Sequence, residues 1–361
     1  MNSSMKKICF LIGNITRTGG TEKVTCQIAF GLANDFNVYI LSLYDNGGQV
    51  NFDLSNKILR KRLSSEKLNS KKDFIRIIHR IRSFVKKYKI DILIDVDTVL
   101  DMYSVPALIG LKTKLVSWEH FNFSESMGTK FRVPFRKYIT RFSDCVVTLT
   151  KEDQKMYKDY FGNRLRIEHI YNPIELTTDN PEYNIMSKTI ITVGRLVRVK
   201  GYDYLMDVAE KVFDKHPDWE LLILGEGEER LTLEQTIAKK NLKQVKLLGR
   251  ISNVDDYLKK AAVFVMTSRN EGFPLVLIEA KSNNLPVVSF RCKTGPAELV
   301  QDNVNGYLID CFDIDKMADK ICYLIENPEI RERFSKNAKL DTEKMNYDMI
   351  MQQWKELLLS F

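Results

Sequence analysis

Residues 263–280 read VFVMTSRNEGFPLVLIEA, a pattern typical of a strand, a turn and a helix in a parallel α/β sheet. The run at 263–266 is short and apolar, as expected for a strand that is buried on both faces. The polar turn ends at Pro274, whose fixed φ suits the start of a helix. Because ligands of open α/β sheets lie beyond the carboxyl ends of the strands, we expect a binding site at this turn.

Other short apolar runs recur along the chain, separated by segments with helical periodicity. We expect strands at 8–12, 38–43, 91–96, 115–118 and 146–149, and again at 189–193, 221–224, 245–248, 263–266 and 286–289. The alternation predicts an α/β fold with two Rossmann-like, doubly wound domains that face a cleft.

The length of 361 residues also favours two domains, at about 150 residues each. We expect a first domain over residues 1–172 and a second domain over 173–346, followed by an amphipathic helix over 347–361. The boundary between the two domains falls within 170–188, where Asn-Pro occurs twice and neither helical nor strand periodicity is present.

The composition excludes a disordered chain, since 44% of the residues are hydrophobic and 28% are charged. No run of 18 apolar residues is present, and the first residues do not have the pattern of an export signal. The six cysteines are scattered without metal-site spacing, so we expect them to be reduced and buried. These features predict a cytoplasmic globular protein.

The positive charge is concentrated in the first half of the chain. Residues 57–89 hold 13 Lys and Arg but only two acidic residues. Residues 73–89 have the spacing of a basic amphipathic helix, and a second basic group surrounds Phe131 and Phe135: Lys130, Arg132, Arg136, Lys137 and Arg141. We expect an anionic membrane surface as the partner, because each basic residue near such a surface contributes about 1 kcal/mol. The stretch matches no nucleic-acid module, so we do not expect nucleic acid.

Candidate site residues in the second half follow two strands. Glu271 lies in the turn after 263–266, the amides of Leu275 and Val276 open the next helix, and Glu279 is about one helical turn further on. Carboxylates there can accept hydrogen bonds from sugar hydroxyls. In ITVGRLVRVKGYDYL, residues 191–205, Arg195 and Lys200 follow a strand and can neutralise a diphosphate. The ordinary alternative is that these are solvated loop charges.

The first half offers weaker signals. In ITRTGGTEKVT, residues 15–25, Gly19 and Gly20 allow a backbone to approach a ligand, although the loop is as often only a tight turn. His120, in VSWEHFNFS, sits just past the strand at 115–118, and a structural histidine is about as common there. Asp95 and Asp97 have the DxD spacing of a metal site. We interpret Asp95 and Asp97 as structural. We expect no metal and no other cofactor, because Arg195 and Lys200 can already neutralise the diphosphate.

Taken together, these motifs resemble the retaining nucleotide-sugar glycosyltransferases of family 4, which have the GT-B fold. The matching elements run in the family's order over nearly the whole chain: GGTE at 19–22, Glu119-His120, Gly194-Arg195 with Lys200, GEGEE at 225–229, LGR at 248–250 and EGFPLVLIE at 271–279. The sequence is most similar to bacterial members that build capsule, O-antigen, exopolysaccharide or polyprenyl-diphosphate-linked glycans.

The resemblance implies that residues 1–172 form the acceptor-side domain and that 173–346 form the nucleotide-sugar-binding domain. It also implies a role for each matched position. Arg195 and Lys200 would hold the donor diphosphate, and Glu279 the ribose hydroxyls. Glu271 with the residues after it, Gly272, Phe273, Leu275 and Val276, would hold the donor sugar. His120 would contact that sugar, Gly20 beside Gly19 would let the loop close over the phosphates, and the base would lie against Arg250 and Ile251.

The implied reaction is retaining transfer of a hexose or N-acetylhexosamine, most commonly from a UDP-sugar, to a lipid-linked or soluble glycan at the inner face of the cell membrane. The family is usually described by front-face attack, with the leaving diphosphate assisting deprotonation of the acceptor. No carboxylate pair at glycosidase spacing is evident. The alternatives are a non-catalytic sugar-nucleotide-binding or scaffold protein of the same fold, and a phosphorylase-like enzyme, whose cofactor lysine we do not find.

Overall fold

The structure, a computed structural model, describes residues 5–126, 132–174 and 182–361. It divides into two compact units. The first comprises Met1–Pro173 together with Met345–Phe361, and the second comprises Ile174–Lys344. The final helix, which the sequence sets apart as 347–361, therefore belongs to the first unit.

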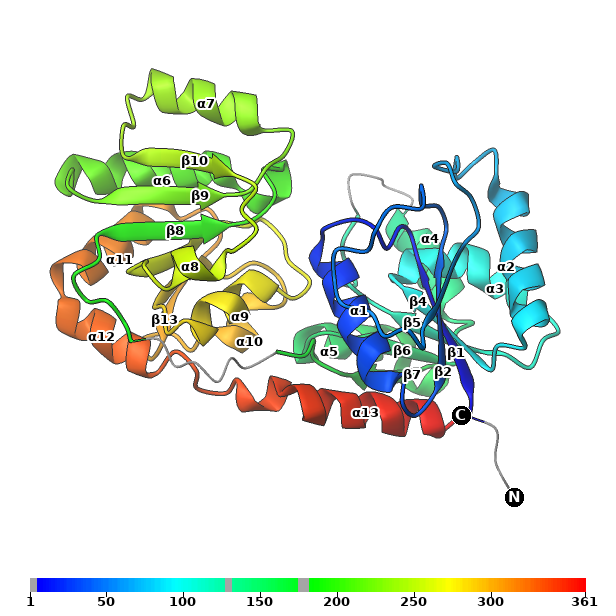
Figure 1. The fold of residues 1–361 in the computed structure, drawn as a ribbon. Helices are drawn as coiled ribbons and strands as arrows, with labels where there is room; N and C mark the ends of the chain where they lie inside the picture. The colour runs from blue at the N-terminus through cyan, green and yellow to red at the C-terminus, as the bar shows by residue number, and fades with distance from the viewer. Residues whose placement is uncertain (1–4, 127–131, 175–181) are drawn as a thin grey trace. The chain divides into compact units, whose positions relative to one another are not determined.

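The first unit is built on a seven-stranded sheet of parallel strands, flanked by helices (Figure 1). Its strand order is β3-β2-β1-β4-β5-β6-β7, which reverses between β1 and β4. The strands are β1 (Lys7–Ile12), β2 (Asn37–Ser42), β3 (Leu59–Arg62), β4 (Ile92–Val96), β5 (Lys114–Trp118), β6 (Cys145–Thr148) and β7 (Arg166–His169). The helices are α1 (Gly20–Leu32), α2 (Phe74–Tyr88), the 3-10 turn η1 (Thr98–Leu100), α3 (Asp101–Leu108), α4 (Arg132–Thr140), α5 (Lys151–Phe161) and η2 (Gly162–Arg164).

The second unit repeats the design with six parallel strands in the order β10-β9-β8-β11-β12-β13. The reversal falls between β8 and β11. The strands are β8 (Thr189–Val193), β9 (Glu220–Leu224), β10 (Val245–Gly249), β11 (Val263–Met266), β12 (Val287–Phe290) and β13 (Gly306–Ile309). The helices are η3 (Arg198–Lys200), α6 (Tyr202–Lys215), α7 (Arg230–Lys239), α8 (Asp255–Leu258), α9 (Leu275–Ser282), α10 (Pro296–Leu299), α11 (Ile314–Glu326) and α12 (Pro328–Lys336). Two such sheets are the GT-B arrangement, which confirms the predicted fold class.

All ten strands expected from the sequence are present, but three further strands were not predicted. These are β3, β7 and β13, and each lies at an edge of its sheet. An edge strand has one neighbour and need not be an apolar run, which accounts for β3 and β7. Strand β13 reads GYLI and is buried, so it was missed for a different reason, its shortness. Strand β3 reads LRKR and is mostly exposed, which is why it was hidden in the basic stretch of the sequence.

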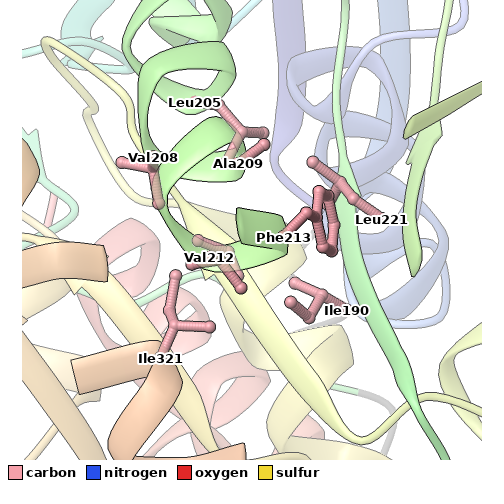
Figure 2. A pocket seen from close by; sticks show the side chains of 9 residues that line it. Ile190, Leu205, Val208, Ala209, Val212, Phe213, Leu221 and Ile321 are labelled. Atoms are coloured by element: carbon pink, nitrogen blue, oxygen red, sulfur yellow. The ribbon is translucent and has the colours of Figure 1, made fainter. Parts of the chain in front are cut away.

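The core of the second unit is packed tightly around α6. A void of about 10 Å³ lies between that helix, β8, β9 and α11. Figure 2 shows the apolar side chains that line it, such as Leu205, Val212, Leu221 and Ile321. A space of this size has room for about one water molecule, and apolar walls give that water no partner. The void is therefore a packing feature and not a binding site.

The cysteines follow the sequence-based expectation with one exception. All six are free thiols, and five are buried, whereas Cys311 is only half-buried. Burial is the main cause that raises the pKa of the Cys26 and Cys145 thiols to about 12. These thiols are therefore protonated at neutral pH and act as apolar packing groups.

Helix α13 (Tyr347–Leu359) packs against the first unit, a partner that the sequence did not reveal. Its Trp354 is fully buried, and the ring lies edge-on to Trp118 with centroids 5.0 Å apart. Lys355 Nζ contacts Asp35 at 2.6 Å at the surface of α13. Trp118 is the last residue of β5, so the end of the chain supports the strand that leads to His120.

We predict that Trp354→Ala strongly destabilises the first unit, because the substitution removes a large buried ring. Truncations of this kind cost about 3–5 kcal/mol of unfolding free energy. Met349→Ala on the same helix is the matched control, since Met349 is exposed. Denaturant unfolding of both variants checks this, and equal small losses would contradict a role for α13 in the core.

Candidate functional site

Backbone contacts join the loops after β8 and β9 at the carboxyl edge of the second sheet. The N–H of Gly194 donates to the carbonyl of Leu224 at 2.9 Å, and the N–H of Leu196 donates to the carbonyl of Glu226 at 3.0 Å. A Cβ on Gly225 would collide with the carbonyl of Gly194, and one on Gly227 with the carbonyl of Leu196. The GEGEE loop therefore needs both glycines to support the Arg195 loop.

A second set of contacts joins the loop after β8 to the loop after β11. Gly201 has a φ of +66°, and a Cβ there would collide with the carbonyl of Thr267. The Thr267 hydroxyl donates to the carbonyl of Lys200 at 3.3 Å. These contacts arise because the strand order reverses between β8 and β11, the place where α/β sheets bind ligands.

Arg269 fastens the same two loops through its side chain. Its guanidinium donates to the carbonyl of Arg198 at 2.8 Å and forms a bidentate pair with Asp203, at 2.7 and 2.5 Å. Its own N–H donates to the carbonyl of Val199 at 2.8 Å. Arg269 thus fixes the turn of η3, which contains Lys200.

The structure brings two of the predicted site residues into direct contact. Lys200 Nζ lies 2.7 Å from Glu271 Oε1, and the two side chains are only 21% and 10% exposed. Arg195, on the same loop as Lys200, has an exposed side chain. A shielded ion pair beside an exposed guanidinium gives this edge both a carboxylate and two cationic groups.

The turn that carries Glu271 is held from behind by the loop after β12. The Thr294 hydroxyl donates to the carbonyl of Glu271 at 2.6 Å. Gly295 has a φ of +82°, and a Cβ there would collide with Pro274. Thr294 and Gly295 therefore support the turn that carries Glu271.

Helix α9 starts one residue later than the sequence predicts. Pro274 is the residue before the helix, with a φ of −77° and a ψ of 92°, and Leu275 is the first helical residue. The N–H groups of Leu275 and Val276 belong to the first turn, where intrahelical acceptors are missing. A helix start of this kind favours an anion.

The remaining predicted residues of the second unit follow the same elements. Glu279 lies on α9 and is partly exposed, and Phe273 is buried in the turn beside Gly272. Arg250 is exposed and Ile251 half-buried, directly after β10. Strand β10 is two strands away from β8. Arg250 and Ile251 therefore lie at the carboxyl edge of the same sheet, further from the reversal than Lys200 and Glu271.

Gly19 and Gly20 mark the start of α1 in the first unit. Gly19 is the residue before the helix, and Gly20 is its first residue. A Cβ on Gly19 would collide with the carboxylate of Glu22, which lies in the first turn. Gly19 therefore makes room for an acidic side chain at the positive end of the helix, as well as giving the loop its freedom.

His120 lies just past β5, but it is more enclosed than the sequence suggests. We expect an exposed polar edge there, whereas the residue is only 9% exposed and its ring centroid is 4.3 Å from that of Trp118. Burial lowers the pKa of His120 to about 4, although the charge of Glu119 acts in the opposite direction. The imidazole is therefore neutral at pH 7 and acts through hydrogen bonds.

The neighbouring Glu119 is a buried carboxylate whose importance the sequence analysis missed. Its Oε2 accepts hydrogen bonds from the hydroxyls of Thr98, at 2.9 Å, and Tyr157, at 2.5 Å. Burial opposes its ionisation, but Arg136 and these hydrogen bonds outweigh that cost and hold the pKa of Glu119 below its usual value. Glu119 is therefore charged at neutral pH.

Asp95 and Asp97 each have a hydrogen-bond partner within the first unit. The Asp95 carboxyl is fully buried, and it accepts a hydrogen bond from Ser104 at 2.7 Å. Burial, followed by the nearby charge of Asp101, raises its pKa well above the usual value. The Asp97 side chain accepts from the N–H of Val99 at 3.0 Å and caps η1. Among the residues that the structure describes, no cluster of three or more metal-ligating side chains occurs.

Comparison with known proteins identifies the family to which this chain is similar. The family description "Glycosyltransferase Family 4" matches residues 18–178, and "Glycosyl transferases group 1" matches residues 177–341. An uncharacterized glycosyltransferase of Haemophilus influenzae is 33% identical over 356 residues, which cover 98% of this chain and 100% of the relative.

Two further similarities span the whole chain. An alpha-1,4-N-acetyl-D-galactosaminyltransferase of Campylobacter jejuni, named for an acceptor on PP-undecaprenol, is 26% identical over 98% of both chains. An Anabaena protein solved in complex with UDP and glucose superposes with a TM-score of 0.82 at 19% identity, over 99% of this chain and 100% of the other. With a full-length relative above 30% identity and the GT-B fold, this chain belongs to the family 4 glycosyltransferases.

Proposed function

We propose that this enzyme transfers a hexose or N-acetylhexosamine from a UDP-sugar, with retention of configuration, to a glycan carried on polyprenyl diphosphate. The observation that carries the proposal is the contact of Lys200 with Glu271 at the reversal of the second sheet. The Campylobacter relative with a PP-undecaprenol acceptor and the Anabaena structure with UDP support the acceptor and the donor. Capsule, O-antigen or exopolysaccharide assembly is the corresponding pathway class.

The donor diphosphate would bind the cations beside β8. Arg195 is exposed and can form a bidentate contact with phosphate oxygens. Lys200 is already paired with Glu271, so a bound phosphate would share its ammonium group with that carboxylate. The amides of Leu275 and Val276 add donors without adding charge. These groups stabilise the leaving diphosphate, which is the role that a metal ion has in other transferases.

The other predicted residues would contact the sugar and the nucleoside of the donor. Glu279 would accept hydrogen bonds from the ribose hydroxyls, while Arg250 and Ile251 would contact the base. Glu271, Gly272 and Phe273 would contact the donor sugar. The first unit would contribute His120 to the sugar and Gly20, next to Gly19, to the phosphates.

The proposed step needs no protein nucleophile. The bond between the anomeric carbon and the diphosphate oxygen breaks, and the acceptor oxygen attacks the same face of the sugar. The acceptor proton passes to the leaving diphosphate, so charge and atoms balance without a metal. The enzyme supplies positioning and charge stabilisation. A neutral His120 fits this scheme as a hydrogen-bonding group and not as a cation.

The experiment that tests this function is a hydrolysis screen of the purified protein against a panel of nucleotide sugars. Slow release of UDP from one donor would identify that donor without knowledge of the acceptor. Release from no UDP-sugar, but from a sugar linked to a different nucleotide, would overturn the donor assignment.

We predict that transfer is metal-independent and depends on both cations. Arg195→Ala or Lys200→Ala should raise the barrier by about 2–4 kcal/mol, because each removes a charge-stabilising donor. Arg198→Ala is the matched control on the same loop, since its side chain is exposed and only its carbonyl has a structural role here. Loss of activity in EDTA with rescue by manganese would contradict the prediction and favour Asp95 and Asp97.

We predict that Glu271→Gln reduces turnover far more than stability, because the variant keeps the size of the side chain and the Thr294 contact to the backbone. His120→Asn should behave in the same way, whereas His120→Ala should also lose stability through the contact with Trp118. Melting temperatures and rates measured on the same samples check this. Stability losses that parallel the rate losses in Glu271→Gln and His120→Asn would show that both residues are structural.

We propose that the first unit attaches peripherally to the anionic inner face of the cell membrane to reach a lipid-linked acceptor. None of the helices within the described ranges is long and apolar enough to cross a bilayer. The structure corrects which cations are available, because Arg60 and Arg62 both pair with the buried Asp45. Arg136 is itself buried. Lys130 and Phe131 lie outside the described residues, as does the side chain of Arg132.

The exposed cations near the start of α2 are therefore the better candidates. Lys67, Lys71 and Lys72 are exposed there, and the neighbouring Ile75 is 62% exposed. The apolar stripe of α2 is otherwise used in the core, where Ile77 and other residues on that stripe are buried. The exposed lysines and Ile75 together suit an anionic interface.

We predict that binding to anionic vesicles falls as salt rises and as Lys67, Lys71 and Lys72 are changed together to serine. Near an anionic leaflet each lysine contributes about 1 kcal/mol, so the triple variant should lose most of the attachment. Changing Lys151, Lys155 and Lys158, which are exposed on α5, removes the same charge as a control. Co-sedimentation measures binding, and equal binding to neutral vesicles would favour a soluble acceptor.

A further inference from the structure

The loop that carries His120 is anchored on both sides by buried hydrogen bonds. Before it, the Glu119 carboxylate accepts from Thr98 in η1 and from Tyr157 in α5. After it, the N–H of Phe121 donates to the other Glu119 oxygen at 3.0 Å. One carboxylate therefore links the loop after β5 to two other elements and closes a turn around His120.

Arg136 of α4 ties the same loop at two further points. Its guanidinium lies 3.7 Å from Glu119 Oε2, and both side chains are almost fully buried. The guanidinium also donates to the carbonyls of Asn122 and Phe123 at 2.8 and 2.7 Å. Its positive charge keeps Glu119 ionised, and its hydrogen bonds fix the backbone that follows His120.

A third anchor comes from α5. Asp153 Oδ1 accepts the N–H of Phe123 at 2.8 Å. Tyr157 lies one helical turn further along the same helix and reaches Glu119. Helix α5 thus contacts the loop on both sides of His120, through Glu119 before it and Phe123 after it.

His120 itself contributes little to its own placement. Its Nε2 is buried and accepts or donates no hydrogen bond within the described part of the chain. The imidazole rests against Trp118, which is in turn backed by Trp354. A buried ring nitrogen without a partner is available to a substrate hydroxyl, but its direction depends on the backbone that holds the ring.

We propose that Glu119, Arg136 and Tyr157 form a positioning network that sets the orientation of His120 toward the donor sugar. This inference rests on the proposed role of His120. The three side chains are almost fully buried, so they act by fixing the loop at residues 119 and 121–123. Tertiary packing joins α4, α5 and η1 at this point, so the network is specific to this fold and not to a short motif.

Tyr157→Phe is the most informative variant because it deletes one hydrogen bond to Glu119 and leaves Arg136 in place. Arg136→Ala would leave a buried carboxylate unpaired, which is strongly destabilising by itself, so that variant does not separate positioning from folding. Thr98→Val deletes the other hydroxyl donor, and Thr98→Ser restores it. Tyr160→Phe is the matched control, since Tyr160 lies on the same helix and is 52% exposed.

The readouts are turnover, UDP affinity, melting temperature and the NMR signal of the His120 imidazole, assigned by its absence in His120→Asn. We expect Tyr157→Phe and Thr98→Val to lower kcat on the order of tenfold, since small misplacements of a contacting group have effects of this size. UDP affinity should not change, and the imidazole signal should shift or broaden. Thr98→Ser and Tyr160→Phe should match the parent protein.

The outcomes separate this inference from the proposed function. An unchanged imidazole signal in Tyr157→Phe and Thr98→Val would overturn the positioning network, whatever the activity. Equal losses of kcat, UDP affinity and melting temperature would also overturn it, because they indicate a general structural defect. A parent protein that neither hydrolyses nor transfers from any nucleotide sugar would refute the proposed function, and the imidazole signal would still decide whether the network orients His120.

Discussion

The loops after β8, β9 and β11 lie backbone against backbone, and glycine is the only residue that fits at three of their contacts. Gly201, Gly225 and Gly227 face the carbonyls of Thr267, Gly194 and Leu196. Any side chain at these positions would push the loops apart. The contact of Lys200 with Glu271 depends on that close approach, because the two residues lie on different loops, 71 positions apart in the chain.

The Lys200–Glu271 pair and the Glu119–Arg136 pair differ in their exposure to solvent, and this difference suits them to different roles. The side chains of Lys200 and Glu271 are partly exposed to solvent, so their hydrogen-bond partners can change when an anionic ligand binds. The side chains of Glu119 and Arg136 are almost fully buried, where an unpaired charge would cost stability. Several hydrogen bonds therefore hold them in place. The first arrangement suits binding, and the second suits the rigid placement of a neighbouring side chain.

Asp95 and Asp97 of the first unit show why the spacing of two carboxylates is by itself weak evidence for a metal site. Asp95 and Asp97 share a motif, but their side chains have different partners. Asp95 is fully buried and bonded to Ser104, whereas Asp97 caps a 3-10 turn. Asp95 faces Asp101, and the proximity of two buried carboxyls favours a protonated form over an ionised one.

The sequence by itself determined the α/β class, ten of the strands and the residues that gather at the carboxyl edge of the second sheet. It did so because buried parallel strands are apolar runs and because glycine, proline and charged residues mark the turns between them. The family resemblance added the roles of the matched residues. The sequence analysis missed β3 and β7, because these edge strands are not apolar runs, and it also missed β13, a buried edge strand of only four residues that begins with glycine. Only the tertiary structure decided that Arg269 and Thr294 support the turns, that α13 packs on Trp118, and that Glu119 is the centre of a buried network. Those contacts join residues that are far apart in the chain, and the local sequence around a charged residue does not record which distant residue it pairs with.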